Sequence, residues 1–64
     1  MNTQEVKKLL AQGELEQAAE LVNYNSPKLQ KYIELKDQPK QGQMYHDWFD
    51  LGDEITKEIQ ELIK

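Results

Sequence analysis

Residues 44–64 read MYHDWFDLGDEITKEIQELIK, and this stretch decides the fold. At about 100° per residue around a helix, its apolar side chains gather on one side. They are Met44, Trp48, Leu51, Ile55, Ile59 and Leu62, widened on one flank by Tyr45, Phe49 and Ile63. The resulting arc spans roughly 160°, against about 100° for the buried stripe of an ordinary surface helix. The sequence therefore predicts one amphipathic helix over 44–63. Two interpretations of its wide apolar face stay open. Either the helix is the central element, packed on both sides by the other helices, or Tyr45, Trp48 and Phe49 cannot all be covered and part of the face meets a second copy or another partner.

Gly52 lies inside this apolar arc and could interrupt the helix. The apolar pattern crosses Gly52 without a change of phase, which favours a continuous helix. The alternative is a break, with Asp53 capping a shorter helix that begins at Glu54. In the continuous helix, Gly52 is expected to mark a place where the backbone of another helix comes close.

The opposite side of the same helix is predicted to be acidic. It carries Asp47, Asp50, Asp53, Glu54, Glu58 and Glu61. Only Lys57, Lys64 and His46 accompany them, so neighbouring carboxylates are expected to repel one another. Such a row is usually a plain solvated face. It is also suited to attracting a basic surface or to imitating the phosphates of a nucleic acid.

Three shorter helices are predicted ahead of this one. The first spans 2–12, where Asn2 and Glu5 can form a capping box and Gly13 ends the helix. The second spans 14–23. Their inward-facing residues are Val6, Leu9 and Leu10 in the first, and Leu15, Ala18, Ala19 and Val22 in the second. Because the connection is short, the pair predicts an antiparallel helical hairpin.

The third helix is predicted over 27–36, with Ser26 as its N-cap and Pro27 at its first position. Leu29, Tyr32 and Ile33 form its inward face. A polar linker, 37–43, follows and contains a proline and a glycine, which end the helical pattern.

Residues 13–20, GELEQAAE, resemble the start of the second helix of a tetratricopeptide repeat, in which a glycine precedes an alanine by five residues, here Gly13 and Ala18. The preceding residues 9–12, LLAQ, are similar to the end of that repeat's first helix. Such repeats need about three stacked copies for stability, and this chain contains one. The resemblance therefore implies a shared helical hairpin and not a solenoid.

The predicted fold class is all-α: a single domain of 64 residues, with three short helices and a longer C-terminal amphipathic helix. A chain of this size buries only about 60% of its surface, so its core is marginal. The absence of cysteine removes disulfides and thiolate zinc sites as stabilising devices. No apolar run approaches the roughly 20 residues of a membrane span, and the first residues lack an export signal. A cytoplasmic protein that does not enter membranes is expected.

The residue inventory argues against direct nucleic-acid binding, metal binding and catalysis. The chain has no arginine, and its net charge of −4 arises entirely within 44–64. No basic cluster is therefore available to neutralise phosphates. His46, Asp50 and Glu54 share one helix face, but a single solvent-facing strip lacks ligands from a second element, so no metal or other cofactor is expected. No nucleophile adjoins a base and no pocket is evident that would shift a carboxylate pKa, so we expect a non-enzymatic protein.

The expected function is protein–protein interaction, as a small regulator, adaptor or inhibitor. The predicted contact surface is the aromatic end of the last helix, Tyr45, Trp48 and Phe49, flanked by Asp47 and Asp50. Tyrosine and tryptophan are over-represented among binding hot spots. Two alternatives remain open: an obligate homodimer whose C-terminal helices pair, and an acidic nucleic-acid mimic that blocks a DNA-binding protein.

Overall fold

The computed structural model describes residues 2–64 and contains four helices over that range, with no strand. They are α1 (Thr3–Ala11), α2 (Leu15–Leu21), α3 (Pro27–Lys36) and α4 (Gln43–Leu62). The all-α prediction is confirmed, and each predicted helix end lies within two residues of the observed one. The 3.6-residue periodicity and the capping residues were therefore sufficient to place the helices.

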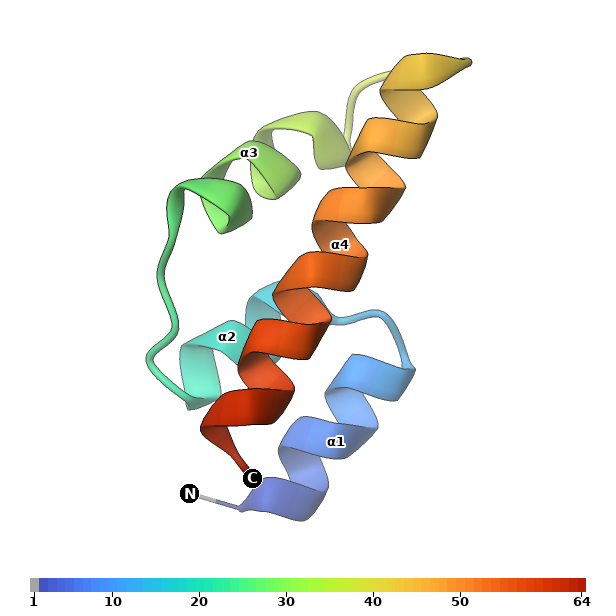
Figure 1. Ribbon diagram of the computed structural model, residues 1–64. Coiled ribbons are helices and arrows are strands. Elements are labelled where there is room, and N and C mark those ends of the chain that lie inside the picture. The colour runs from blue at the N-terminus through green and yellow to red at the C-terminus, as the bar shows by residue number, and fades with distance from the viewer. Residues whose placement is uncertain (1) are drawn as a thin grey trace.

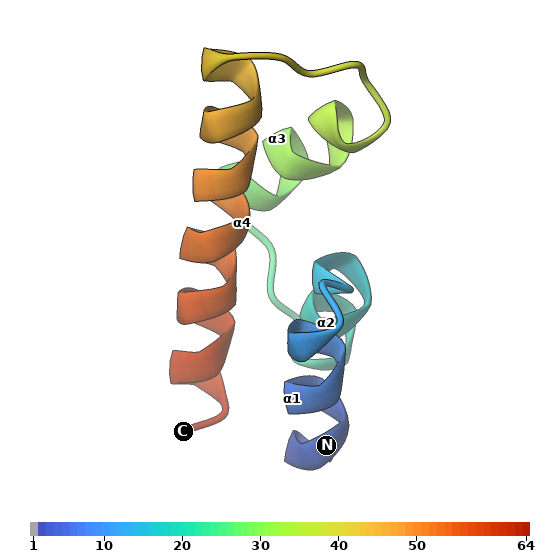
Figure 2. The ribbon, with the colours of Figure 1, turned by 90° about the vertical axis from the view of Figure 1, so that its right-hand side faces the viewer.

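The longest helix, α4, is a rod that runs the length of the molecule (Figure 1). The hairpin of α1 and α2 lies beside its C-terminal half, and α3 crosses its N-terminal half (Figures 1 and 2). Close packing joins α3 to α4, α2 to α4, and α1 to α2. The molecule is accordingly elongated, with extents of 36 × 20 × 17 Å. This arrangement leaves one side of the N-terminal half of α4 without a covering helix (Figure 2).

The two helices of the hairpin end with the same backbone motif. At Gly13 the chain adopts a φ of +78°, and the Glu14 N–H donates to the Leu9 carbonyl at 2.8 Å. At Asn23 φ is +55°, and the Tyr24 N–H donates to the Ala19 carbonyl at 2.8 Å. Both are Schellman caps, which need a left-handed residue and accept asparagine as second choice to glycine. The glycine cap was predicted from the sequence, whereas the asparagine cap was not.

Side chains cap the starts of α1 and α3. The Asn2 side chain accepts from the backbone N–H groups of Gln4 and Glu5, at 3.0 and 3.4 Å. The reciprocal bond of a capping box, from the Glu5 side chain, is not formed within the described residues. Ser26 caps α3 as predicted, since its hydroxyl accepts from the Leu29 N–H at 3.2 Å.

A single apolar core joins all four helices. Its buried members are Val6, Leu10, Leu15, Ala18, Ala19, Leu29, Tyr32, Ile55 and Ile59. Ile55 and Ile59 are 0% exposed and lie on α4 one turn apart. The C-terminal half of α4 is therefore the centre of the core, and the hairpin and α3 close around it.

Gly52 lies inside the continuous helix α4, so the prediction of an uninterrupted helix is confirmed. The expectation that another helix backbone approaches there is wrong. A Cβ atom on Gly52 would instead lie 3.1 Å from Cε2 of Tyr32 and 3.5 Å from Cδ1 of Leu15. The absent side chain makes room for the tyrosine ring of α3 and for the first leucine of α2.

Candidate interaction groove

The N-terminal half of α4 exposes large apolar side chains. Phe49 is 59% exposed, Tyr45 is 49% exposed, and Met44 is also exposed. Trp48, between them in sequence, is half-buried and packs against the core. Of the two interpretations of the wide apolar arc, these exposures agree with the one in which part of the arc stays uncovered.

Tyr45 and Phe49 border a groove between α4 and the hairpin, which we call the aromatic groove. It has a volume of about 290 Å³. Gly52 contributes to its lining together with Tyr32 and Leu15, which fill the space that a side chain on Gly52 would take. The groove is lined by Leu10, Gly13, Leu15, Tyr32, Tyr45, Trp48, Phe49, Gly52, Asp53 and Thr56. Residues from all four helices and the α1–α2 turn therefore form one apolar site.

Trp48 is held by contacts from two sides. Its ring stacks on Tyr32 with centroids 5.0 Å apart and 11° between the planes. Its indole N–H donates to the Tyr32 carbonyl at 3.3 Å. The Lys40 ammonium lies 4.6 Å from the ring centroid on α4, a cation–π distance. Trp48 thus forms a fixed wall of the aromatic groove, whereas the Tyr45 and Phe49 rings remain available.

The same lysine closes the C-terminal end of α3. The Lys40 ammonium donates to the carbonyls of Leu35, Lys36 and Gln38, at 2.6, 3.0 and 2.8 Å. The last carbonyls of a helix lack partners within the helix, and a positive charge there also complements the helix dipole. The linker between α3 and α4 therefore anchors both α3 and the tryptophan wall.

The sequence predicts Asp47 and Asp50 beside the aromatic contact surface, but the acid that lines the groove is a different one. Asp53 lines the groove, about 40° around α4 from Phe49. Asp50 follows on the same outer flank, about 100° from Phe49. Asp47 lies about 160° away and accepts a hydrogen bond from Gln43 at 2.9 Å. Asp53, and not Asp47, is the acid beside the aromatic rings, a point that the helical positions alone could have shown.

The sequence predicted few basic neighbours for the acids of α4 along the helix itself, and the structure adds a lysine from another helix. Lys28, from α3, donates to Glu58 at 2.6 Å and lies 3.6 Å from Glu54. Two further pairs are local: Lys57 with Asp53 at 3.6 Å, and Lys64 with Glu61 at 3.4 Å. Both local pairs are well exposed, so each contributes little. The row of carboxylates is thus broken by an ion pair between helices.

Glu58 is also the centre of a small polar network that ties α4 to the α2–α3 loop. The Tyr24 hydroxyl donates to Glu58 at 2.7 Å, and the Ser26 hydroxyl donates to Tyr24 at 2.9 Å. The bonds from Lys28 and then Tyr24 hold the pKa of Glu58 below its ordinary value. The bond to Glu58 raises the pKa of Lys28. Burial, followed by the carboxylate, raises the pKa of Tyr24.

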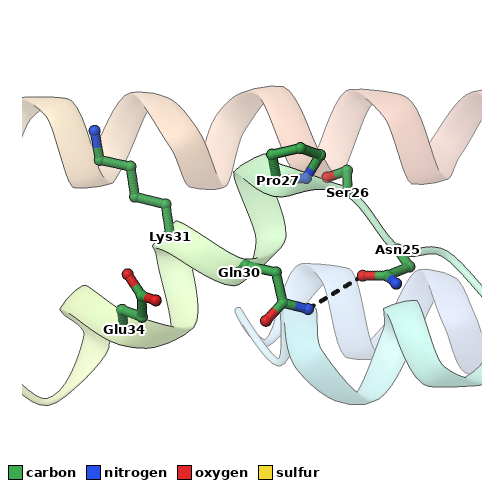
Figure 3. A pocket seen from close by; sticks show the side chains of 6 residues that line it. All are labelled: Asn25, Ser26, Pro27, Gln30, Lys31 and Glu34. Atoms are coloured by element: carbon green, nitrogen blue, oxygen red, sulfur yellow. Dashed lines mark hydrogen bonds between the residues drawn. The ribbon is translucent and has the colours of Figure 1, made fainter.

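A second hollow lies along the start of α3 and is shown in Figure 3. It has a volume of about 770 Å³, and its lining residues all fall within 25–34. Gln30 donates across it to Asn25 at 3.1 Å. Since one short stretch of chain supplies every lining residue, this is a concavity beside a single helix and not a site built between elements.

Residues 2–64 contain no cluster of three histidine, aspartate or glutamate side chains placed to hold a metal ion. His46, Asp50 and Glu54 therefore share a helix face without forming such a cluster. Among the described residues, no helix has both the length and the apolarity that crossing a membrane requires.

Comparison with known proteins gives no further assignment. No family model matches the chain, and no curated protein or solved structure matches it significantly. Inferences about function therefore depend on the aromatic groove and the charges around it.

Proposed function

We propose that this protein is a non-enzymatic interaction module that binds another protein through the aromatic groove. The observation that carries the proposal is the exposure of Phe49 and Tyr45, 59% and 49%, at the rim of an apolar groove. Aromatic side chains that stand beside a preformed apolar pocket are typical of binding hot spots.

The free energy available at these two rings is substantial. An aromatic side chain buries about 150–250 Å², so the exposed parts of Tyr45 and Phe49 amount to about 100 Å² each. Covering both would contribute about 5 kcal/mol, at about 25 cal/mol per Å², before the costs of association. That gain is large enough for the rings of Tyr45 and Phe49 to act as the hot spots of an interface.

The nucleic-acid mimic finds less support than the interaction module. A mimic needs a regular row of free carboxylates along one surface. Lys28 engages Glu58 and Glu54 in the middle of that row, and Asp47 is turned away from Asp53. The acids on the groove side are better suited to complementing a few basic residues of a protein partner.

The proposal is tested by affinity capture from a cell extract, followed by reconstitution with the purified captured protein. The test variant is Tyr45→Ala/Phe49→Ala. The control is Leu62→Ala, since Leu62 lies on the same helix, is 55% exposed and does not line the groove. Wild type and control should bind the purified protein, and the double variant should lose at least about ten-fold in affinity. Equal binding by all three would contradict the proposal.

A further inference from the structure

The aromatic groove runs along α4 from Tyr45 to Thr56. This length of helix corresponds to about 16 Å or three helical turns. The N-terminal half of α4 extends past the end of α1, which leaves this part of α4 without α1 beside it (Figure 2). Apolar side chains one turn apart on an incoming helix would meet the exposed rings of Tyr45 and Phe49, in the way that helix ridges fill grooves.

The charges beside the groove indicate which charge the flank of the incoming helix should carry. Asp53 lines the groove and Asp50 lies on the same outer flank of α4. The Lys57 ammonium, 3.6 Å from Asp53 and well exposed, neutralises it only weakly in water. The whole chain carries a net charge of −4. Lysine or arginine on the incoming segment would therefore be attracted over a distance and held at the rim.

A second copy of this chain fits the groove poorly. A stable interface of standard size buries about 800 Å² on each partner. The exposed parts of Tyr45, Phe49 and Met44 together supply only about 300 Å². A symmetric pairing at this site would also bring Asp50 and Asp53 of one copy toward the same acids of the other, in a chain that is already acidic.

We infer that the aromatic groove receives a short amphipathic helix of a partner protein, with apolar residues about one turn apart and lysine or arginine on its flank. This inference depends on the proposed function and specifies the class of partner. Tyr45 and Phe49 contact the apolar residues, Trp48 forms the rigid wall, and Asp50 and Asp53 contact the basic flank.

The test is a selection from a displayed library of random peptides of about 12 residues, a length set by the part of α4 that lines the groove. Binders of wild type are retained only if they fail to bind Tyr45→Ala/Phe49→Ala. The retained peptides are then synthesised and titrated against wild type, Asp50→Asn/Asp53→Asn, and the matched control Asp47→Asn. Circular dichroism in the bound state reports whether each peptide becomes helical.

The expected binders carry apolar residues at i and i+4 together with lysine or arginine, and become helical on binding. Asp50→Asn/Asp53→Asn should weaken them about three- to ten-fold at low salt and flatten the salt dependence, whereas Asp47→Asn should not. Peptides that need Tyr45 and Phe49 for binding but carry no net positive charge, or do not become helical when bound, would overturn this inference and leave the proposed function intact. A different result would overturn both this inference and the proposed function in favour of a homodimer: no selected peptide needs the two rings for binding, and the protein self-associates unless Phe49 is replaced by alanine.

Discussion

The two halves of α4 follow the same amphipathic pattern but have different surroundings. In 53–62, Ile55 and Ile59 are completely buried in the core. In 43–52, α3 covers one side only, and Phe49 and Tyr45 stay in water. The difference arises because α1 packs on α2 and ends at Ala11, before it reaches the N-terminal half of α4. A uniform apolar stripe can thus serve as core at one end of a helix and as binding surface at the other.

Truncation in the C-terminal half should have the largest effect on stability. Ile59→Ala is expected to lower the free energy of unfolding by about 2–5 kcal/mol, because it opens a cavity among side chains that cannot collapse fully. In a chain with so small a core, that loss would leave much of the population unfolded at room temperature. Urea denaturation followed by circular dichroism measures it. A loss as small as that of Leu62→Ala would show that this half of α4 is not the centre of the core.

A methyl group at the boundary between the halves should have the next largest effect. Gly52→Ala gains about 1 kcal/mol of helix propensity, but its Cβ would meet the Tyr32 ring, which is stacked on Trp48 and cannot easily move. Overpacking of this kind costs about 1–3 kcal/mol, so we expect a net loss of about 1 kcal/mol. The same substitution in a Tyr32→Leu background should be stabilising relative to that background. A higher melting temperature for Gly52→Ala alone would contradict this account.

The sequence contained enough information for the helices, but not for the partners of their side chains. Periodicity crosses Gly52 unchanged, and Ser26-Pro27 marks the start of α3, so both features followed from local rules. The fixation of Trp48 depends on Tyr32, sixteen residues away in the chain, and the pairing of Lys28 with Glu58 spans thirty residues. Contacts of this kind depend on how the helices cross, which no local pattern specifies.

The polar network at Glu58 should make the C-terminal half of α4 sensitive to acid. Since the folded protein lowers the pKa of Glu58, its contribution is complete above the ordinary glutamate value of 4.5 and is lost as pH falls through the lower folded value. Glu58→Gln should therefore be less stable than wild type at neutral pH, and the difference should shrink as the pH falls below 4.5. Urea midpoints across this range test it, with Glu61→Gln as control. A difference that stays constant with pH would show that the ion pair contributes nothing.

Phe49→Ala, in the N-terminal half, should have the smallest effect on stability. The side chain is 59% exposed, and substitutions at such positions usually change the free energy of unfolding by no more than about 0.5 kcal/mol. The comparison with Ile59→Ala, ten residues further along the same helix, then separates the two roles of one apolar stripe. A residue is a binding residue when its truncation changes the free energy of unfolding little but strongly lowers the affinity of a complex. If Phe49→Ala unfolds the chain as Ile59→Ala does, Phe49 belongs to the core and is not available to bind a partner at the groove.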